Sequence, residues 1–192
     1  MNRRIGIVGY GKLGQHLVHT LRQQDGLELA FVWNRRADAI GSEIPTDQRL
    51  THLTDFSRMA PDFIVEVAHP SITWEHGVRF LSACDYMVGS PTAFAREGVE
   101  AEMRAAASND HGHGLYIPRG ALPGLGEVLR MVEKNTLGAA EICMRKHPSS
   151  LKYGAPLDPP LDQTQAERSV YDGPLRQLCE LAPNNVNTMA VL

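Results

Sequence analysis

Short apolar runs alternate with segments of helical periodicity along the first part of the chain. The helical segments cover residues 72–83 and 93–107, and another begins near residue 12. The apolar runs, each typical of a buried strand, cover residues 4–8, 28–33, 62–67, 85–89 and 115–117. Such alternation is typical of a parallel sheet that helices cover on both faces. We therefore predict a doubly wound α/β domain over residues 1–114, ending at a polar, glycine-rich turn.

The first apolar run leads directly into the glycine fingerprint Gly9-Tyr10-Gly11-Lys12-Leu13-Gly14. In this pattern Gly9 makes the tight turn, Gly11 lets the backbone approach a pyrophosphate, and Gly14 lets helix and strand pack closely. The helix that follows presents unpaired N–H groups and a positive dipole end to the phosphates. We predict a Rossmann-type dinucleotide site with Gly9, Gly11, Lys12, Leu13 and Gly14 as cofactor contacts. The alternative is a glycine-rich turn that binds no ligand.

The residues after the second apolar run indicate which dinucleotide is preferred. A site for NAD places an acidic residue about twenty positions after the glycines, where it binds the adenosine ribose hydroxyls. Asn34 occupies that place here, and Arg35 and Arg36 follow it. Because a guanidinium forms charge-assisted hydrogen bonds with a 2′-phosphate, we predict a slight preference for NADP, with NAD still accepted. The alternative is that both arginines are solvated loop charges.

The pattern changes after residue 114, and we predict a smaller, incomplete α+β second unit over residues 115–192. A proline-rich loop covers residues 156–160, and Asn187 or Thr188 would cap a helix that starts near the last residue. The other predicted elements are a helix at 125–134, a long strand near 140–146, a strand at 168–171 and a short helix at 175–181. Because these few elements offer little apolar surface to bury against one another, we expect that the natural protein is a longer chain.

Composition narrows the function classes. The 192 residues are 43% hydrophobic and carry a net charge of -3 without long runs of one sign, which argues against a nucleic-acid partner. No segment is long and apolar enough to span a bilayer, and no signal sequence precedes the first strand, so we expect a cytoplasmic protein. Three widely spaced cysteines indicate buried free thiols rather than disulfides or a thiolate metal site. His111 and His113 are expected in a polar loop, so we predict no metal site.

Several blocks of sequence together resemble the L-aspartate dehydrogenase family, in particular the animal aspartate dehydrogenase domain-containing proteins. The resemblance covers nearly the whole chain. It is carried by residues 8–14, by Val32-Trp33-Asn34-Arg35, Val65-Glu66-Val67-Ala68-His69-Pro70, Val88-Gly89-Ser90-Pro91 and Arg119-Gly120-Ala121-Leu122, and by Ala182-Pro183-Asn184-Asn185-Val186-Asn187. The late Asn-Val-Asn and the Gly-Ala step are far more specific than the glycine fingerprint.

The resemblance implies a homodimeric enzyme that oxidises L-aspartate, passes hydride to NAD or NADP, and gives iminoaspartate and then oxaloacetate and ammonia. It places further cofactor contacts at Gly120 and Ala121 and at Asn185, with Asn187 as second choice. Substrate contacts are assigned to Arg119 and, from a basic segment after the predicted long strand, to Lys146 and His147. The family's catalytic histidine lies beyond residue 192, so we expect an incomplete active site and leave the catalytic residue of this chain unassigned.

Residues at the strand ends are further candidates. His69 should lie at the carboxyl edge of the sheet, where ligands bind, or cap a helix, and its neighbours Val67 and Ala68 would line the nicotinamide ribose pocket. Arg119 would reach a substrate carboxylate or pair with Glu66 or Glu127. Glu66 would act as a base or, more simply, as a fixed hydrogen-bond acceptor.

Two other functions fit the same residues. One is a shortened, inactive subunit or regulator that binds NADP through its first domain. The other is a related two-domain reductase, such as a dihydrodipicolinate reductase or a homoserine dehydrogenase, and the Asn-Val-Asn segment favours aspartate dehydrogenase over these.

Overall fold

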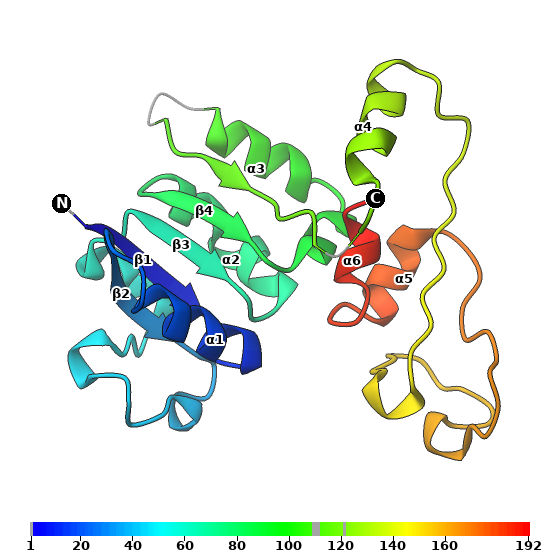
Figure 1. Ribbon diagram of the computed structural model, residues 1–192, viewed down its shortest axis with the longest axis horizontal. Helices are drawn as coiled ribbons and strands as arrows, with labels where there is room; N and C mark the ends of the chain where they lie inside the picture. Colours follow the sequence, from blue (N-terminus) through cyan, green and yellow to red (C-terminus); the bar gives the residue numbers. More distant parts are fainter. Residues whose placement is uncertain (1, 109–111, 121) are drawn as a thin grey trace.

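A computed structural model describes residues 2–108, 112–120 and 122–192, and its first part is a five-stranded parallel sheet (Figure 1). The strands are β1 (Arg3–Val8), β2 (Leu27–Trp33), β3 (Phe63–Glu66), β4 (Asp85–Val88) and β5 (Leu115–Tyr116), and their order in the sheet is β2-β1-β3-β4-β5. Every pairing is parallel. This topology confirms the predicted Rossmann-type α/β class.

Helices cover both faces of the sheet, because the strands are continuous apolar runs whose successive side chains point to opposite faces. Ile5 and Ile7 pack with Val18 and Leu21 of α1 (Lys12–Leu21) on one face. On the other face the core is larger. It gathers side chains from the strands, from α2 (Pro70–Leu81) and α3 (Val99–Ala107), and from the 3₁₀ segment η3 (Leu53–Met59), including Phe31, Phe56, Ile64, Phe80, Tyr86 and Met103. Shorter 3₁₀ turns are η1 (Ala37–Ala39), η2 (Thr46–Gln48) and η4 (Pro91–Ala95).

The strand order places a topological switch point beside β1. The chain passes from β1 to its neighbour β2 and then crosses to β3 on the opposite side of β1. In open α/β sheets the crevice at this point, outside the carboxyl ends of the strands, is where ligands bind. The glycine fingerprint, residues 34–36 and residues 68–69 follow the ends of β1, β2 and β3, so all three segments lie at that edge.

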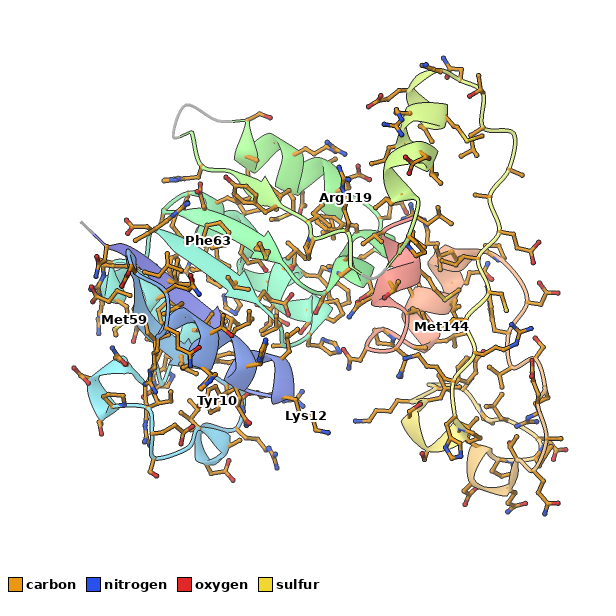
Figure 2. The ribbon with its side chains drawn as sticks, in the orientation of Figure 1. Tyr10, Lys12, Met59, Phe63, Arg119 and Met144 are labelled. Carbon is orange, nitrogen blue, oxygen red and sulfur yellow. The ribbon has the colours of Figure 1, made fainter. Side chains whose placement is uncertain are left out.

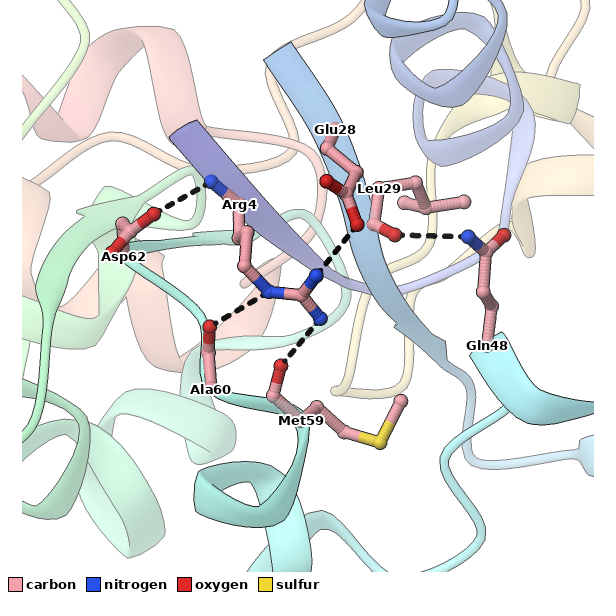
Figure 3. A network of polar contacts seen from close by, with 7 residues as sticks. All are labelled: Arg4, Glu28, Leu29, Gln48, Met59, Ala60 and Asp62. Atoms are coloured by element: carbon pink, nitrogen blue, oxygen red, sulfur yellow. Dashed lines mark hydrogen bonds and ion pairs between the residues drawn. The ribbon is translucent and has the colours of Figure 1, made fainter. Parts of the chain in front are cut away.

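The opposite, amino-terminal edge is held by Arg4, whose contacts Figure 3 shows. Its guanidinium bonds to the carbonyl oxygens of Met59 at 2.9 Å and Ala60 at 3.1 Å, and pairs with Glu28 at 2.6 Å. Its backbone N–H donates to the Asp62 carboxylate at 2.8 Å. Arg4 therefore links β1, β2 and the segment that leads into β3, far from the predicted cofactor site.

The sheet continues past the predicted domain boundary. β5 begins one residue beyond residue 114 and pairs with β4 through Tyr86 and Leu115. Residues after it lie beyond the carboxyl ends of the strands (Figure 1). Their regular elements are α4 (Leu125–Glu133), η5 (Pro148–Ser150), η6 (Leu161–Gln163), α5 (Leu175–Leu181) and α6 (Asn187–Ala190).

The strands predicted at 140–146 and 168–171 are wrong, because both segments have irregular backbone. Apolar positions do alternate in the first segment, and Ile142 and Met144 pack against the small cluster formed by Cys179, Ala182, Val186 and Met189. Alternation of this kind shows which side chains face inward, but a strand also needs a neighbouring backbone for its hydrogen bonds. The predicted cap of the last helix is also wrong: Val186 is the N-cap, and Asn187 already lies within α6.

The second part packs on the first through η4. Ala95 contacts the Cys179 cluster, and the buried Thr92 hydroxyl bonds to Pro183 O at 2.9 Å and Asn187 Oδ1 at 3.1 Å. On the other side of η4, Trp74 Nε1 donates to Ala93 O at 2.9 Å. The 3₁₀ turn after β4 is therefore the joint between the sheet and the residues near the end of the chain.

Two expectations from composition can be compared with the structure. Cys84 and Cys179 are buried and free as predicted, but the prediction is wrong for Cys143, which is exposed on the irregular segment. Among the described residues, no helix has the length and apolar character needed to cross a membrane.

Candidate functional site

The glycine fingerprint folds so that two of its glycines have no room for a side chain. Gly9 has φ +112°, and a Cβ there would lie 2.7 Å from Val67 O. A Cβ on Gly14 would lie 2.0 Å from Gly9 O, because the first turn of α1 packs directly on the end of β1. Around Gly11, in contrast, a Cβ would meet no atom of the described residues within 4 Å. The backbone is therefore closed on the protein side and open at Gly11.

The start of α1 presents unpaired amides at the same place. Gly11 is the N-cap and supplies no side-chain cap, and its carbonyl accepts the first helical bond, from Gln15 N at 2.9 Å. The N–H groups of the first turn therefore have no partner within the helix, and the helix dipole adds positive potential there. Lys12 and Leu13 are exposed in this turn, and the exposed fraction of Leu13 is 55%. Figure 2 labels Lys12, the first residue of α1. This arrangement suits a pyrophosphate.

Asn34 connects the glycine loop to the segment after β2. Its Oδ1 accepts from Tyr10 N at 3.1 Å, and its Nδ2 donates to Arg36 O at 2.9 Å. Gly9 N also donates to Trp33 O at 2.8 Å. Asn34 thus uses both ends of its amide to hold the segment that carries the exposed Arg35 and Arg36 beside the glycine loop.

His69 caps α2. Its Nδ1 accepts from Ser71 N at 3.2 Å, and Pro70 occupies the first helical turn, where a missing N–H costs nothing. Desolvation, and then the positive charge of Arg35, lower the pKa of His69. The neutral imidazole therefore carries its proton on Nε2, since Nδ1 is the acceptor. The capping alternative is confirmed, and it leaves Nε2 available as a donor at the sheet edge.

Glu66 is fully buried and accepts four hydrogen bonds. Oε1 accepts from Ala68 N at 2.6 Å, His69 N at 2.8 Å and Ser90 Oγ at 3.0 Å, and Oε2 accepts from Ser90 N at 3.0 Å. Desolvation raises the pKa of Glu66, while these hydrogen bonds act in the opposite direction. The simpler prediction, a fixed acceptor, describes these contacts.

Of the residues from the two later sequence blocks, 119–122 and 182–187, only some lie near the carboxyl ends of the strands. Gly120 has φ +61°, and a Cβ there would lie 3.9 Å from Thr188 Cα, so the segment after β5 passes beside α6. Asn187 lies against Thr92 through the hydrogen bond described above. Asn185 instead holds an irregular loop, with Nδ2 donating to Ser150 O and Oδ1 accepting from Lys152 N, each at 2.8 Å. Ala121 lies outside the described residues.

The predicted substrate residues are exposed and separate from this network. Neither predicted ion pair of Arg119 forms among the described residues, because Glu66 is bonded as above and Glu127 pairs with Arg130. Figure 2 labels Arg119. Lys146 is exposed, and His147 caps η5 through Nδ1, which accepts from Ser149 N at 3.3 Å.

Three contacts at the edge were not predicted. The Tyr10 hydroxyl donates to Glu43, and burial raises the pKa of Tyr10 to about 12. Ser90 and Thr92 link β4 to Glu66 and to Asn187. The signal for these last two was present in the sequence, since small hydroxyl residues follow directly after an apolar run that ends in glycine.

The comparisons with known proteins agree with this geometry. One family model, described as homoserine dehydrogenase, NAD binding domain, matches residues 9–118, and another, described as aspartate dehydrogenase, C-terminal, matches residues 127–192. The chain is 46% identical over 191 residues to the aspartate dehydrogenase domain-containing protein of Xenopus tropicalis, a match that covers 97% of this chain and 67% of that protein. It is 27% identical over 199 residues to the L-aspartate dehydrogenase of Nitrosopumilus maritimus, covering 99% of this chain and 72% of that one.

A solved structure shares the fold. The aspartate dehydrogenase of Thermotoga maritima superposes with a TM-score of 0.63 at 20% identity, over 99% of this chain and 72% of that one. At this identity the likeness concerns the fold alone. The fold, the two family models and the Xenopus relative agree with the resemblance seen in the sequence, and the chain belongs to the aspartate dehydrogenase family, with a Rossmann-like NAD-binding first part.

Proposed function

We propose that this chain binds NAD or NADP in the crevice at the carboxyl ends of β1, β2 and β3. The observation that supports this most is the open backbone at Gly11 between two glycines that admit no side chain, at a helix start with unpaired amides. A pyrophosphate would accept hydrogen bonds from those amides, and Lys12 adds a positive charge nearby. The adenosine half would then lie toward residues 34–36, and the nicotinamide half toward residues 68–69 and 89–92.

We propose a slight preference for NADP. Arg35 and Arg36 are exposed on a segment that Asn34 holds beside the glycine loop, and no carboxylate occupies the position that binds ribose hydroxyls in NAD sites. A guanidinium placed there would form charge-assisted hydrogen bonds with the 2′-phosphate.

The proposed reaction is the oxidative deamination of L-aspartate to iminoaspartate, followed by hydrolysis to oxaloacetate and ammonia. Its support is membership of the family and the name of the Nitrosopumilus maritimus relative. When bound, the nicotinamide supplies a hydride acceptor. The chain's own residues would hold and orient the reactants. His69 Nε2–H would donate at the edge, and Gly120, Ala121, Asn185 and Asn187 are the proposed neighbours of the cofactor, with the Asn185 side chain already bonded to Ser150 O and Lys152 N. Arg119, Lys146 and His147 are the proposed partners of the substrate carboxylates. No residue of this chain is assigned as the catalytic acid or base.

The test measures binding and turnover separately. NADPH and NADH are titrated by cofactor fluorescence, and reduced cofactor is then followed after L-aspartate and NADP are mixed with the protein. Reduction with L-aspartate but not with L-homoserine supports the proposal and excludes the homoserine dehydrogenase alternative. Saturable binding without turnover would instead favour an NADP-binding subunit that is not active by itself. Failure to bind either cofactor contradicts the proposal altogether.

Two further expectations remain proposals of the same kind. For a homodimer, analytical ultracentrifugation would give a molecular mass twice the 21.2 kDa of one chain. A cytoplasmic location would be visible in cell fractionation.

A further inference from the structure

The Glu66 carboxylate joins two loops of the crevice edge that are distant in sequence. One loop follows β3 and contains Ala68 and His69, and the other follows β4 and begins with Gly89 and Ser90. The loop after β4 also bonds directly to the end of β3, since Gly89 N donates to Glu66 O at 2.8 Å. With 0% exposure, Glu66 cannot itself meet a ligand, so its effect on one must pass through these loops.

The bonds made by the two carboxylate oxygens are unequal. Oε1 accepts from two backbone amides and the Ser90 hydroxyl, whereas Oε2 accepts from Ser90 N alone. All three amides are obligate donors, so only an oxygen can face each of them. An ionised carboxylate satisfies all of them at once.

We propose that Glu66 is a positioning residue that holds the Ser90 loop in place for the nicotinamide half of the dinucleotide. The inference rests on the proposed function, which places the adenosine half at residues 34–36 and the other half over the ends of β3 and β4. Ser90 is the N-cap of η4, where Thr92 bonds to Asn187, so the loop that Glu66 holds leads into the contact between the two parts of the chain.

The substitution Glu66→Gln tests this because it removes one acceptor and adds one donor at nearly constant volume. The amide oxygen of glutamine would take the Oε1 place, where it meets three donors. Its NH₂ would then face Ser90 N–H, and two donors in contact must separate. The Ala68 and His69 bonds would survive, so the damage is confined to the loop after β4.

Asp62→Asn is the matched control. It makes the same chemical change at the opposite end of the same strand, where Asp62 accepts from Arg4 N at 2.8 Å. Each variant and the wild type are titrated with NADPH and with 2′,5′-ADP, which carries only the adenosine half. Backbone amide exchange is measured by NMR without ligand at Ser90, Ala68 and His69.

We expect Glu66→Gln to raise the Kd for NADPH about tenfold, which is the scale of one buried hydrogen-bonding group left unpaired. The Kd for 2′,5′-ADP should stay within about twofold of the wild-type value. Exchange at Ser90 should accelerate about tenfold, with Ala68 and His69 unchanged. Asp62→Asn should alter neither affinity.

Two results would overturn the inference. Unchanged NADPH affinity and Ser90 exchange in Glu66→Gln would show that the carboxylate positions nothing. Equal loss of both ligands, with faster exchange at all three amides, would show that Glu66 only maintains the fold. If the wild type binds neither nucleotide, the proposed function fails, and Ser90 exchange still shows whether the carboxylate holds the loop.

Discussion

The Thr92 hydroxyl and the Asn187 side-chain oxygen lie 3.1 Å apart, although the two residues are 95 positions apart in the chain. Thr92 has a single hydroxyl proton, which Asn187 Oδ1 shares with Pro183 O at 2.9 Å. One buried hydroxyl therefore connects the turn after β4 to the segment that leads into α6.

Thr92→Val should weaken this connection. The change keeps the shape of the side chain but leaves Pro183 O and Asn187 Oδ1 without their donor, and the free energy of unfolding should fall by about 1–3 kcal/mol. Urea unfolding measures the loss, and amide exchange should show faster opening at residues 187–190. In the control Thr73→Val, which removes a buried hydroxyl bonded to Tyr86 at 2.9 Å, those residues should keep their protection. Equal opening in both variants would contradict a local role for Thr92.

Alanine substitutions at two glycines of the same loop should affect different properties, stability in one case and NADPH binding in the other. Gly14→Ala places a methyl group 2.0 Å from Gly9 O and should destabilise the fold by about 1–3 kcal/mol through overpacking. Gly11→Ala meets nothing within 4 Å and has φ -78°, so stability should change by less than about 0.5 kcal/mol. NADPH binding should nevertheless fall in Gly11→Ala, because the methyl group occupies the open side of the loop. Thermal unfolding and fluorescence titration separate the two effects, and unchanged binding in Gly11→Ala would exclude close approach of a phosphate there.

Arg35→Ala should reduce affinity for NADP selectively. Loss of one charge-assisted hydrogen bond to the 2′-phosphate should raise the Kd for NADPH about tenfold or more, whereas NADH carries an uncharged hydroxyl there and its Kd should change little. Isothermal titration of both cofactors measures this. The control is Arg58→Ala, since Arg58 is 80% exposed on η3 and lies outside the crevice edge. Parallel losses for both cofactors would mean that Arg35 acts on the loop rather than on the phosphate.

Stability should decline on acidification through His69. Its pKa in the folded protein lies below the ordinary value of 6.5, so the unfolded chain binds the proton more readily. The stabilisation is therefore present above about pH 6.5 and is lost as the pH falls through the lowered pKa, because the protonated imidazole is held in a desolvated place near the positive charge of Arg35. Tm measured from pH 8 to about 5 should fall less steeply in His69→Asn, which keeps a cap that does not titrate.

The three thiols should react at different rates. Cys84 and Cys179 are buried, and desolvation raises the pKa of Cys84 to about 12 and also raises that of Cys179. Iodoacetamide at about pH 8 should therefore modify the exposed Cys143 first. Mass spectrometry of the folded protein should show one added group, and the same treatment in urea should show three. Early modification of Cys84 would mean that the core around α2 opens readily.

Sequence periodicity predicted the sheet well because its strands are buried and continuous. Val8, Phe31 and Ile64 belong to short apolar runs of the length typical of buried strands, and helices between such strands are typical of a parallel sheet. After residue 122 the same reasoning predicted the helices α4 and α5 correctly, but its two strands were wrong. Ile142 and Met144 alternate like strand residues, but they pack on a small cluster from an irregular backbone, and alternation does not specify a backbone partner.

The candidate site was predictable only where a motif specifies the backbone. Glycine is needed at positions 9 and 14 because a Cβ there would lie under 3 Å from backbone atoms. The glycine pattern of the sequence indicates this need directly. The roles of Glu66 and Asn185 depend instead on which distant amides their side chains meet, Ser90 N in one case and Lys152 N in the other. Such pairings between segments leave no periodic signal in a single sequence.

Because Trp74 is hydrogen-bonded to Ala93 O, its fluorescence should report on the position of η4. The chain has two tryptophans, and they lie at opposite sides of the crevice edge: Trp33 adjoins the glycine loop, and Trp74 touches the turn after β4. The Arg96 guanidinium, 5.0 Å above the Trp74 ring, makes that indole sensitive to displacement of the turn. In Trp33→Phe the remaining tryptophan emission would come from the proposed nicotinamide side alone, and in Trp74→Phe from the proposed adenosine side, so stopped-flow traces of the two variants would time the arrival of each half of a dinucleotide separately.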